Sequence, residues 1–140
     1  MSTRPTIFEI GTTIGDYQII SVIGRGGMGK VFKVRNLLSD RTEAMKALLP
    51  DIDARPDLVE RFLREIKVVA ALEHPGIASL RTALRVNDQI LMIMEYVEGS
   101  SLHWHIQQGR IDTARAVGFA EVAGSCRSRP EDKNQDQIEL

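Results

Sequence analysis

The sequence predicts an α+β fold: a five-stranded antiparallel sheet with one main helix, followed by two shorter helices. Three observations lead to this fold class. Short runs of β-branched and aromatic residues alternate with turn residues, one longer segment has apolar residues at helical spacing, and two short segments near the carboxyl end begin with helix-capping residues. At 140 residues the chain is long enough for one domain, or for part of a larger one.

The expected strands lie on both sides of the main helix. Turn residues separate most of them, as Asn87 and Asp88 separate the last two. Strands joined by short turns pair antiparallel, so we expect a meander before the helix and a hairpin after it. The five expected strands are residues 17–23, 32–35, 43–49, 77–86 and 89–97.

The main helix is expected to begin at Pro56, since proline suits the first helical position, and to end before the segment 74–76. Glu65 falls inside its apolar face on a helical wheel. An unpaired buried carboxylate costs several kcal/mol, so Glu65 should reach water or pair with a cation, for which Lys46 on the preceding strand is the candidate. The apolar face consists of Leu58, Phe62, Ile66, Val69, Ala70 and Leu72.

The glycines Gly24, Gly26 and Gly29 match three phosphate-binding patterns, because backbone N–H groups without side chains approach phosphate oxygens closely. The P-loop pattern needs Ser or Thr where Val31 stands. The dinucleotide pattern needs a helix and then an acid about 20 residues on, near Glu43. The third pattern, Gly-x-Gly-x-x-Gly-x-Val between two strands, matches at every fixed position. The glycines alone also leave open a hairpin turn that binds nothing.

Composition argues against several function classes. The 18 basic and 19 acidic residues give a net charge of −1, which provides no electrostatic footprint for nucleic acid or an anionic membrane. The single cysteine, Cys126, forms no internal disulfide, and His103 and His105 lie too far apart around a helix to share a metal ion. The longest apolar run, 90–94, is shorter than the roughly 20 residues of a membrane span. From these residues we expect no metal site. No signal peptide is evident, so we expect a cytoplasmic chain.

Five segments of the sequence occur in a fixed order: IGRGGMGKV (23–31), AMK (44–46), FLRE (62–65), HPGI (74–77) and MEYVEGSSL (94–102). Together they resemble the small lobe of a protein kinase, and most closely the eukaryotic-like serine/threonine kinases of bacteria. The order and spacing agree from about Tyr17 to about Ala123.

The resemblance implies ATP as the ligand and gives each site residue a role. Lys46 would contact the α- and β-phosphates and pair with Glu65, and these two are the candidate catalytic residues. The glycines would cover the phosphates, Val31 and Ala44 would press on the adenine, and Met94 would be the gatekeeper. The implied ATP-binding residues are Ile23, Gly24, Arg25, Gly26, Gly27, Met28, Gly29, Val31, Ala44, Lys46 and Met94, with the backbone of Glu95 and Val97 on the adenine edge.

The resemblance also divides the chain into a leader (1–16), the small lobe (17–97), the hinge exit with the first helices of the large lobe (98–123), and a polar tail (124–140) that we expect to be disordered. The family's His-Arg-Asp-x-x-x-x-Asn and Asp-Phe-Gly motifs, which supply the base and the magnesium ligands, do not occur in the sequence. We therefore expect a truncated kinase that is inactive alone. Glu43 stands where the family has an apolar residue, and we expect this departure to change little.

Two other functions stay open. A non-catalytic interaction module would dock on another kinase or a partner protein through an apolar surface around Phe119 and Val122. A P-loop or dinucleotide-binding protein would have a helix, and not a strand, directly after Gly29. The conformation after Gly29 therefore distinguishes a P-loop or dinucleotide-binding protein from a kinase.

Overall fold

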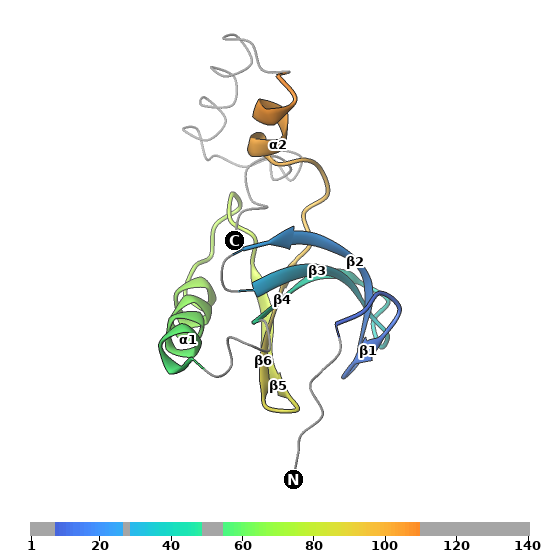
Figure 1. Ribbon diagram of the computed structural model, residues 1–140, viewed down its shortest axis with the longest axis vertical. Coiled ribbons are helices and arrows are strands. Elements are labelled where there is room, and N and C mark those ends of the chain that lie inside the picture. The colour runs from blue at the N-terminus through green and yellow to red at the C-terminus, as the bar shows by residue number, and fades with distance from the viewer. Residues whose placement is uncertain (1–7, 27–28, 49–54, 110–140) are drawn as a thin grey trace. The chain divides into compact units, whose positions relative to one another are not determined.

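The structure, a computed structural model, describes residues 8–26, 29–48 and 55–109 (Figure 1). The chain divides into two units, residues 1–72 with 79–96 and residues 73–78 with 97–140. Within the described ranges, the first unit contains an antiparallel sheet and helix α1 (Pro56–Ala70), and the second contains helix α2 (Leu102–Gln107).

The sheet consists of the strands β1 (Thr13–Ile14), β2 (Tyr17–Arg25), β3 (Gly29–Asn36), β4 (Thr42–Leu48), β5 (Leu80–Val86) and β6 (Gln89–Glu95). Their order is β1-β2-β3-β4-β6-β5, and every neighbouring pair is antiparallel. The expected count of five strands was wrong by one, because β1 was not recognised. It has two residues and turns back onto β2 through Gly15, whose φ of 59° suits glycine. So short a strand shows no alternation that a sequence pattern can detect.

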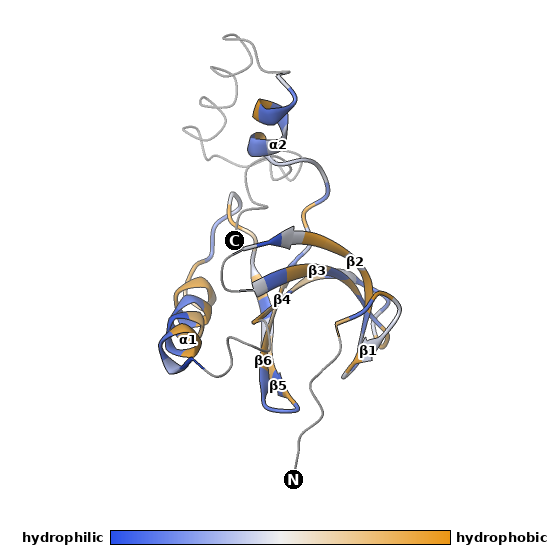
Figure 2. Cartoon of the chain, viewed as in Figure 1, coloured by the Kyte–Doolittle hydropathy of each residue, from blue (hydrophilic) through white to orange (hydrophobic). Residues whose placement is uncertain are grey.

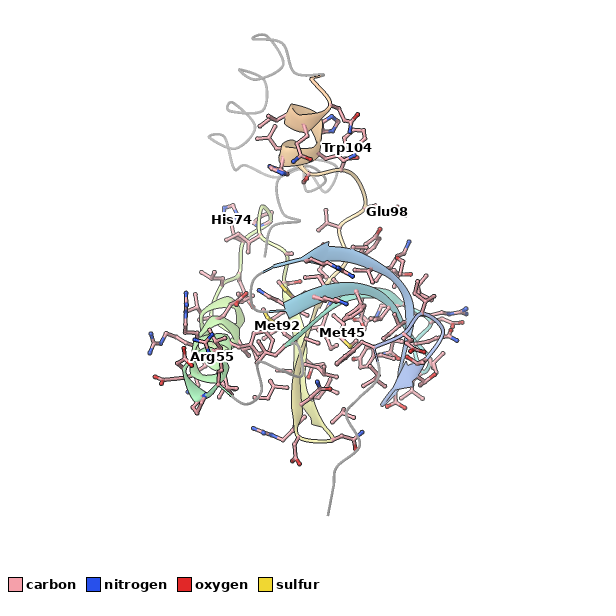
Figure 3. The ribbon with its side chains drawn as sticks, viewed as in Figure 1. Met45, Arg55, His74, Met92, Glu98 and Trp104 are labelled. Atoms are coloured by element: carbon pink, nitrogen blue, oxygen red, sulfur yellow. The ribbon has the colours of Figure 1, made fainter. Side chains whose placement is uncertain are left out.

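Alternation along the strands separates two faces of the sheet. On β4, the side chains of Glu43, Met45 and Ala47 are buried on one face, which carries the main apolar cluster. Lys46 and its cross-strand neighbour Met92 lie on the opposite face, and Figure 3 labels one methionine from each face, Met45 and Met92. The main cluster consists of Ile14, Tyr17, Ile19, Phe32, Val34, Met45, Ala47, Leu91 and Ile93.

Helix α1 is amphipathic, with an apolar side and a charged side (Figure 2). Pro56 occupies the first turn, as expected. Burying a large apolar side chain contributes about 1.5–3 kcal/mol, so the buried side of α1 provides much of its stability. The helix ends at Ala70, earlier than expected, and Leu72 is 42% exposed and does not extend the buried face. The buried residues of α1 are Leu58, Phe62, Ile66 and Val69.

Turn and capping residues have the roles that the sequence predicts. Asn87 and Asp88 have φ values of 48° and 65° and form the two-residue turn between β5 and β6. In the second unit, the Ser101 hydroxyl accepts a hydrogen bond from the Trp104 N–H at 3.0 Å and caps α2. Residues 110–123, which include the second of the two expected shorter helices, and the expected tail 124–140 lie outside the described residues. Neither described helix has the length and apolar content needed to cross a membrane.

Candidate functional site

The glycine cluster forms the turn between two antiparallel strands. Gly24 of β2 pairs with Val31 of β3, and the Gly26 N–H donates to the Gly29 carbonyl at 2.9 Å. The intervening residues 27–28 lie outside the described ranges. Because a strand follows Gly29, the helix that P-loop and dinucleotide sites require is not there. The local structure matches the third glycine pattern.

The three glycines differ in what their backbone positions allow. A Cβ atom at Gly29 would overlap the Ala47 carbonyl oxygen on β4 and lie 3.1 Å from the Ala47 carbonyl carbon. A Cβ atom at Gly24 would make ordinary contact with Val31, and one at Gly26 would meet no atom of the described residues within 4 Å. Gly29 is therefore required by the close approach of β3 and β4, whereas Gly26 has no packing reason to be glycine.

One face of the sheet carries four of the expected site side chains, those of Val31, Ala44, Lys46 and Met94, with Gly24 paired beside Val31. Side chains directly opposite each other in antiparallel strands lie on the same face. The small Ala44, the branched Val31 and the Lys46 ammonium group therefore form one continuous surface next to the glycine hairpin. Across the strands, one row consists of Gly24, Val31, Lys46 and Met92, and the next consists of Lys33, Ala44 and Met94.

Lys46 on β4 and Glu65 on α1 form an ion pair. The Lys46 Nζ donates to Glu65 Oε1 at 2.7 Å, and the side chains are 12% and 23% exposed. The pairing expected from the sequence is thus present, and it explains how the apolar face of α1 can carry an acid. An ammonium group has three donors, so this contact leaves two for other acceptors on the same face.

Glu95 ends β6 in a fixed position. Its N–H donates to the Ser79 carbonyl at 2.9 Å, and its Oε2 accepts hydrogen bonds from the Ser79 N–H and Oγ, both at 3.2 Å. Tyr96 follows, and the Lys33 Nζ lies 4.8 Å from the centre of its ring. Sequence reasoning missed this contact, because β3 and β6 are separated by β4 in the sheet.

Burial, and not a specific contact, describes the positions of four expected residues. Ile23 is half-buried and Arg25 is exposed, both near the end of β2. Met94 is buried at the end of β6. Val97 is half-buried and is the residue with which the chain enters the second unit.

Glu43 is a second buried acid, on the other face of β4, and its cross-strand neighbours are Val34 and Glu95. It is 3% exposed, its Oε1 lies 4.0 Å from the Arg41 Nη2, and its Oε2 has no hydrogen-bond partner among the described residues. Burial raises the pKa of Tyr17, the negative charge of Glu43 raises it further, and a hydrogen bond with the Asn36 side chain opposes both. Strand alternation, which puts Glu43 on the same face as Met45, was the available signal for its burial.

A family model described as the protein kinase domain matches residues 17–122. The chain belongs to the protein kinase family. The order of its elements agrees with this assignment: a glycine hairpin, a strand lysine and a helix glutamate that pairs with it are parts of the kinase small lobe. The resemblance to protein kinases seen in the sequence is thereby confirmed at the level of the family.

Curated relatives of the chain are serine/threonine kinases. The serine/threonine-protein kinase pkn3 of Myxococcus xanthus is 37% identical over 119 residues, which are 79% of this chain and 22% of that protein. PknJ of Mycobacterium tuberculosis is 33% identical over 107 residues, which are 76% of this chain and 18% of that protein. The chain therefore spans about a fifth of the length of these two relatives.

Solved kinase structures share the fold. The PknI kinase domain of Mycobacterium tuberculosis has a TM-score of 0.65 at 24% identity, over 86% of this chain and 50% of that chain. PpkA in its apo form has a TM-score of 0.68 at 21% identity, over 83% of this chain and 50% of that chain. The likeness thus covers half of each of these structures.

Proposed function

We propose that this chain supplies the ATP-binding part of a serine/threonine protein kinase. The Lys46–Glu65 pair carries the proposal, because the pair lies on the sheet face that adjoins the glycine hairpin. Glu65 holds the ammonium group by one donor and leaves two donors for the α- and β-phosphate oxygens. ATP supplies the phosphoryl group that kinases of this class transfer to serine or threonine.

The adenine end of the proposed site is apolar, with backbone hydrogen-bonding groups at its edge. Val31 and Ala44 offer a branched and a small side chain to one face of a flat ring, and Met94 stands in the same row as Ala44. The backbone of Glu95 and Val97 would bind the polar edge of the ring. Ligand pockets commonly combine apolar walls with a few polar groups in this way.

We further propose that the 140-residue chain does not transfer phosphate alone. Phosphoryl transfer requires a base for the hydroxyl group and ligands for magnesium, and the motifs that provide them in kinases do not occur in this sequence. The purified chain incubated with labelled ATP should show no autophosphorylation. The interaction-module alternative depends on the surface around Phe119 and Val122, which lies outside the described residues.

ATP binding is tested by titrating the isotope-labelled chain with Mg-ATP and monitoring the backbone NMR shifts. The wild-type chain should show saturable shifts on β2, β3 and β4. Lys46→Met should weaken binding about tenfold or more, because a charged hydrogen bond contributes about 1.5–3 kcal/mol. Lys67→Met is the matched control, since Lys67 is an exposed lysine of α1 and its loss removes the same charge. Equal affinity in the two variants, or no saturable binding by folded wild type, would contradict the proposal.

A further inference from the structure

We infer that Lys33 is a positioning residue for adenine recognition. Through its contact with Tyr96, it holds the end of β6, Glu95 and Tyr96, in the conformation that offers the Glu95 backbone to the adenine edge. The inference rests on the proposed ATP site. It assigns a function to the contact between the Lys33 ammonium group and the Tyr96 ring, which lie 4.8 Å apart.

The contact spans the width of two strand spacings, because β4 lies between β3 and β6. Neighbouring strands are about 4.8 Å apart, so the lysine must extend over β4 to reach the ring. The residue beside Lys33 on β4 is Ala44, and its methyl group leaves room for the lysine stem. A large side chain at position 44 would occupy that path.

Different contacts hold Glu95 and Tyr96. Glu95 is the last residue of β6 and is bound to Ser79 through three hydrogen bonds. Tyr96 lies just beyond the strand, where the ladder of β6 has ended. The ammonium group above its ring holds this residue against the sheet from the side of β3.

The attraction between Lys33 and Tyr96 is a cation–π interaction, which depends on a positive charge over an aromatic face. Both side chains are half-buried, so solvent screens them incompletely. Lys33 also lies on the face that would hold the nucleotide, and its charge offers a second explanation: direct attraction of phosphate. A useful test must therefore separate binding of the base from binding of the phosphates.

The first measurement compares two probes by calorimetric titration: adenosine, and tripolyphosphate with magnesium. Lys33→Met should weaken adenosine binding about two- to five-fold and leave tripolyphosphate binding unchanged. Lys33→Arg should restore adenosine binding, because guanidinium also binds an aromatic face. Lys67→Met, which removes a lysine charge far along the sequence on α1, should bind both probes as wild type does. Loss of tripolyphosphate affinity in Lys33→Met that equals or exceeds the loss for adenosine would overturn the inference.

The second measurement needs no ligand. Amide hydrogen exchange of residues 95 and 96 should be faster in Lys33→Met and in Tyr96→Leu than in wild type, and unchanged in Tyr96→Phe, which keeps the ring. Exchange that is the same in Lys33→Met and wild type would overturn the inference. If wild type binds neither adenosine nor Mg-ATP, the proposed function fails, and hydrogen exchange decides whether Lys33 restrains this segment.

Discussion

Glu65 and Glu43 both stand in largely apolar surroundings, and the difference between them shows what makes a buried acid part of a site. Glu65 has the Lys46 ammonium group at 2.7 Å. Glu43 is more deeply buried, yet its nearest cation, Arg41, is exposed and lies 4.0 Å away. A close, part-buried cation such as Lys46 can be oriented toward a ligand, whereas an exposed cation at 4.0 Å compensates little for the cost of burying a carboxylate.

Neutralising the two acids in turn tests this comparison most directly, and we expect the largest effect at Glu65. Glu65→Gln should weaken Mg-ATP binding about tenfold, because Lys46 loses the charge that orients its ammonium group. Glu43→Gln should leave the affinity within about two-fold, since position 43 lies on the opposite face of β4. The NMR titration described above measures both. Equal losses in the two variants would show that the faces of β4 are not functionally distinct.

The glycine hairpin allows the same separation of site from scaffold. Gly29→Ala should lower the free energy of unfolding by about 1–3 kcal/mol or more, because the new Cβ overlaps the Ala47 carbonyl oxygen. Gly26→Ala should change it by less than about 0.5 kcal/mol, since in the described part of the chain nothing lies within 4 Å of its Cβ. Urea unfolding followed by circular dichroism compares the two. A stable Gly29→Ala chain would contradict the packing requirement at this glycine.

How much the sequence predicts depends on whether a feature is local or depends on strand order. The Lys46–Glu65 pair was predictable, because helical spacing put an acid on an apolar face and a burial cost demanded a partner. The contact between Lys33 and Tyr96 was not, since it depends on β4 lying between β3 and β6. The requirement at Gly29 was equally hidden, because it arises from a backbone distance to another strand.

Glu43 itself gives the next prediction, which concerns stability. Glu43→Leu should raise the free energy of unfolding by about 1–3 kcal/mol, because it removes a buried oxygen that has no hydrogen-bond partner among the described residues and adds apolar volume beside the core. Urea unfolding at neutral pH measures the gain, with Glu65→Leu as the contrasting variant that should lose stability. A loss of stability in Glu43→Leu would mean that the Arg41 contact outweighs the cost of burial.

The smallest expected effect is the influence of Glu43 on Tyr17 in alkaline solution. Burial, and then the Glu43 charge, raise the pKa of Tyr17 above its usual value of 10.0 in the folded chain. Because the unfolded chain loses this proton first, the associated stability is complete below pH 10.0 and is lost as the pH rises through the higher folded value. Stability measured against pH should therefore fall less steeply for Tyr17→Phe than for wild type. The pH dependence of Glu43→Gln should be intermediate between those of Tyr17→Phe and wild type, because this variant removes the Glu43 charge and leaves Tyr17 buried. If the pH dependence of Glu43→Gln instead equals that of wild type, the carboxylate has no influence on the pKa of Tyr17. The cost of burying Glu43 then comes from Oε2 alone, for which the described residues provide no hydrogen-bond partner.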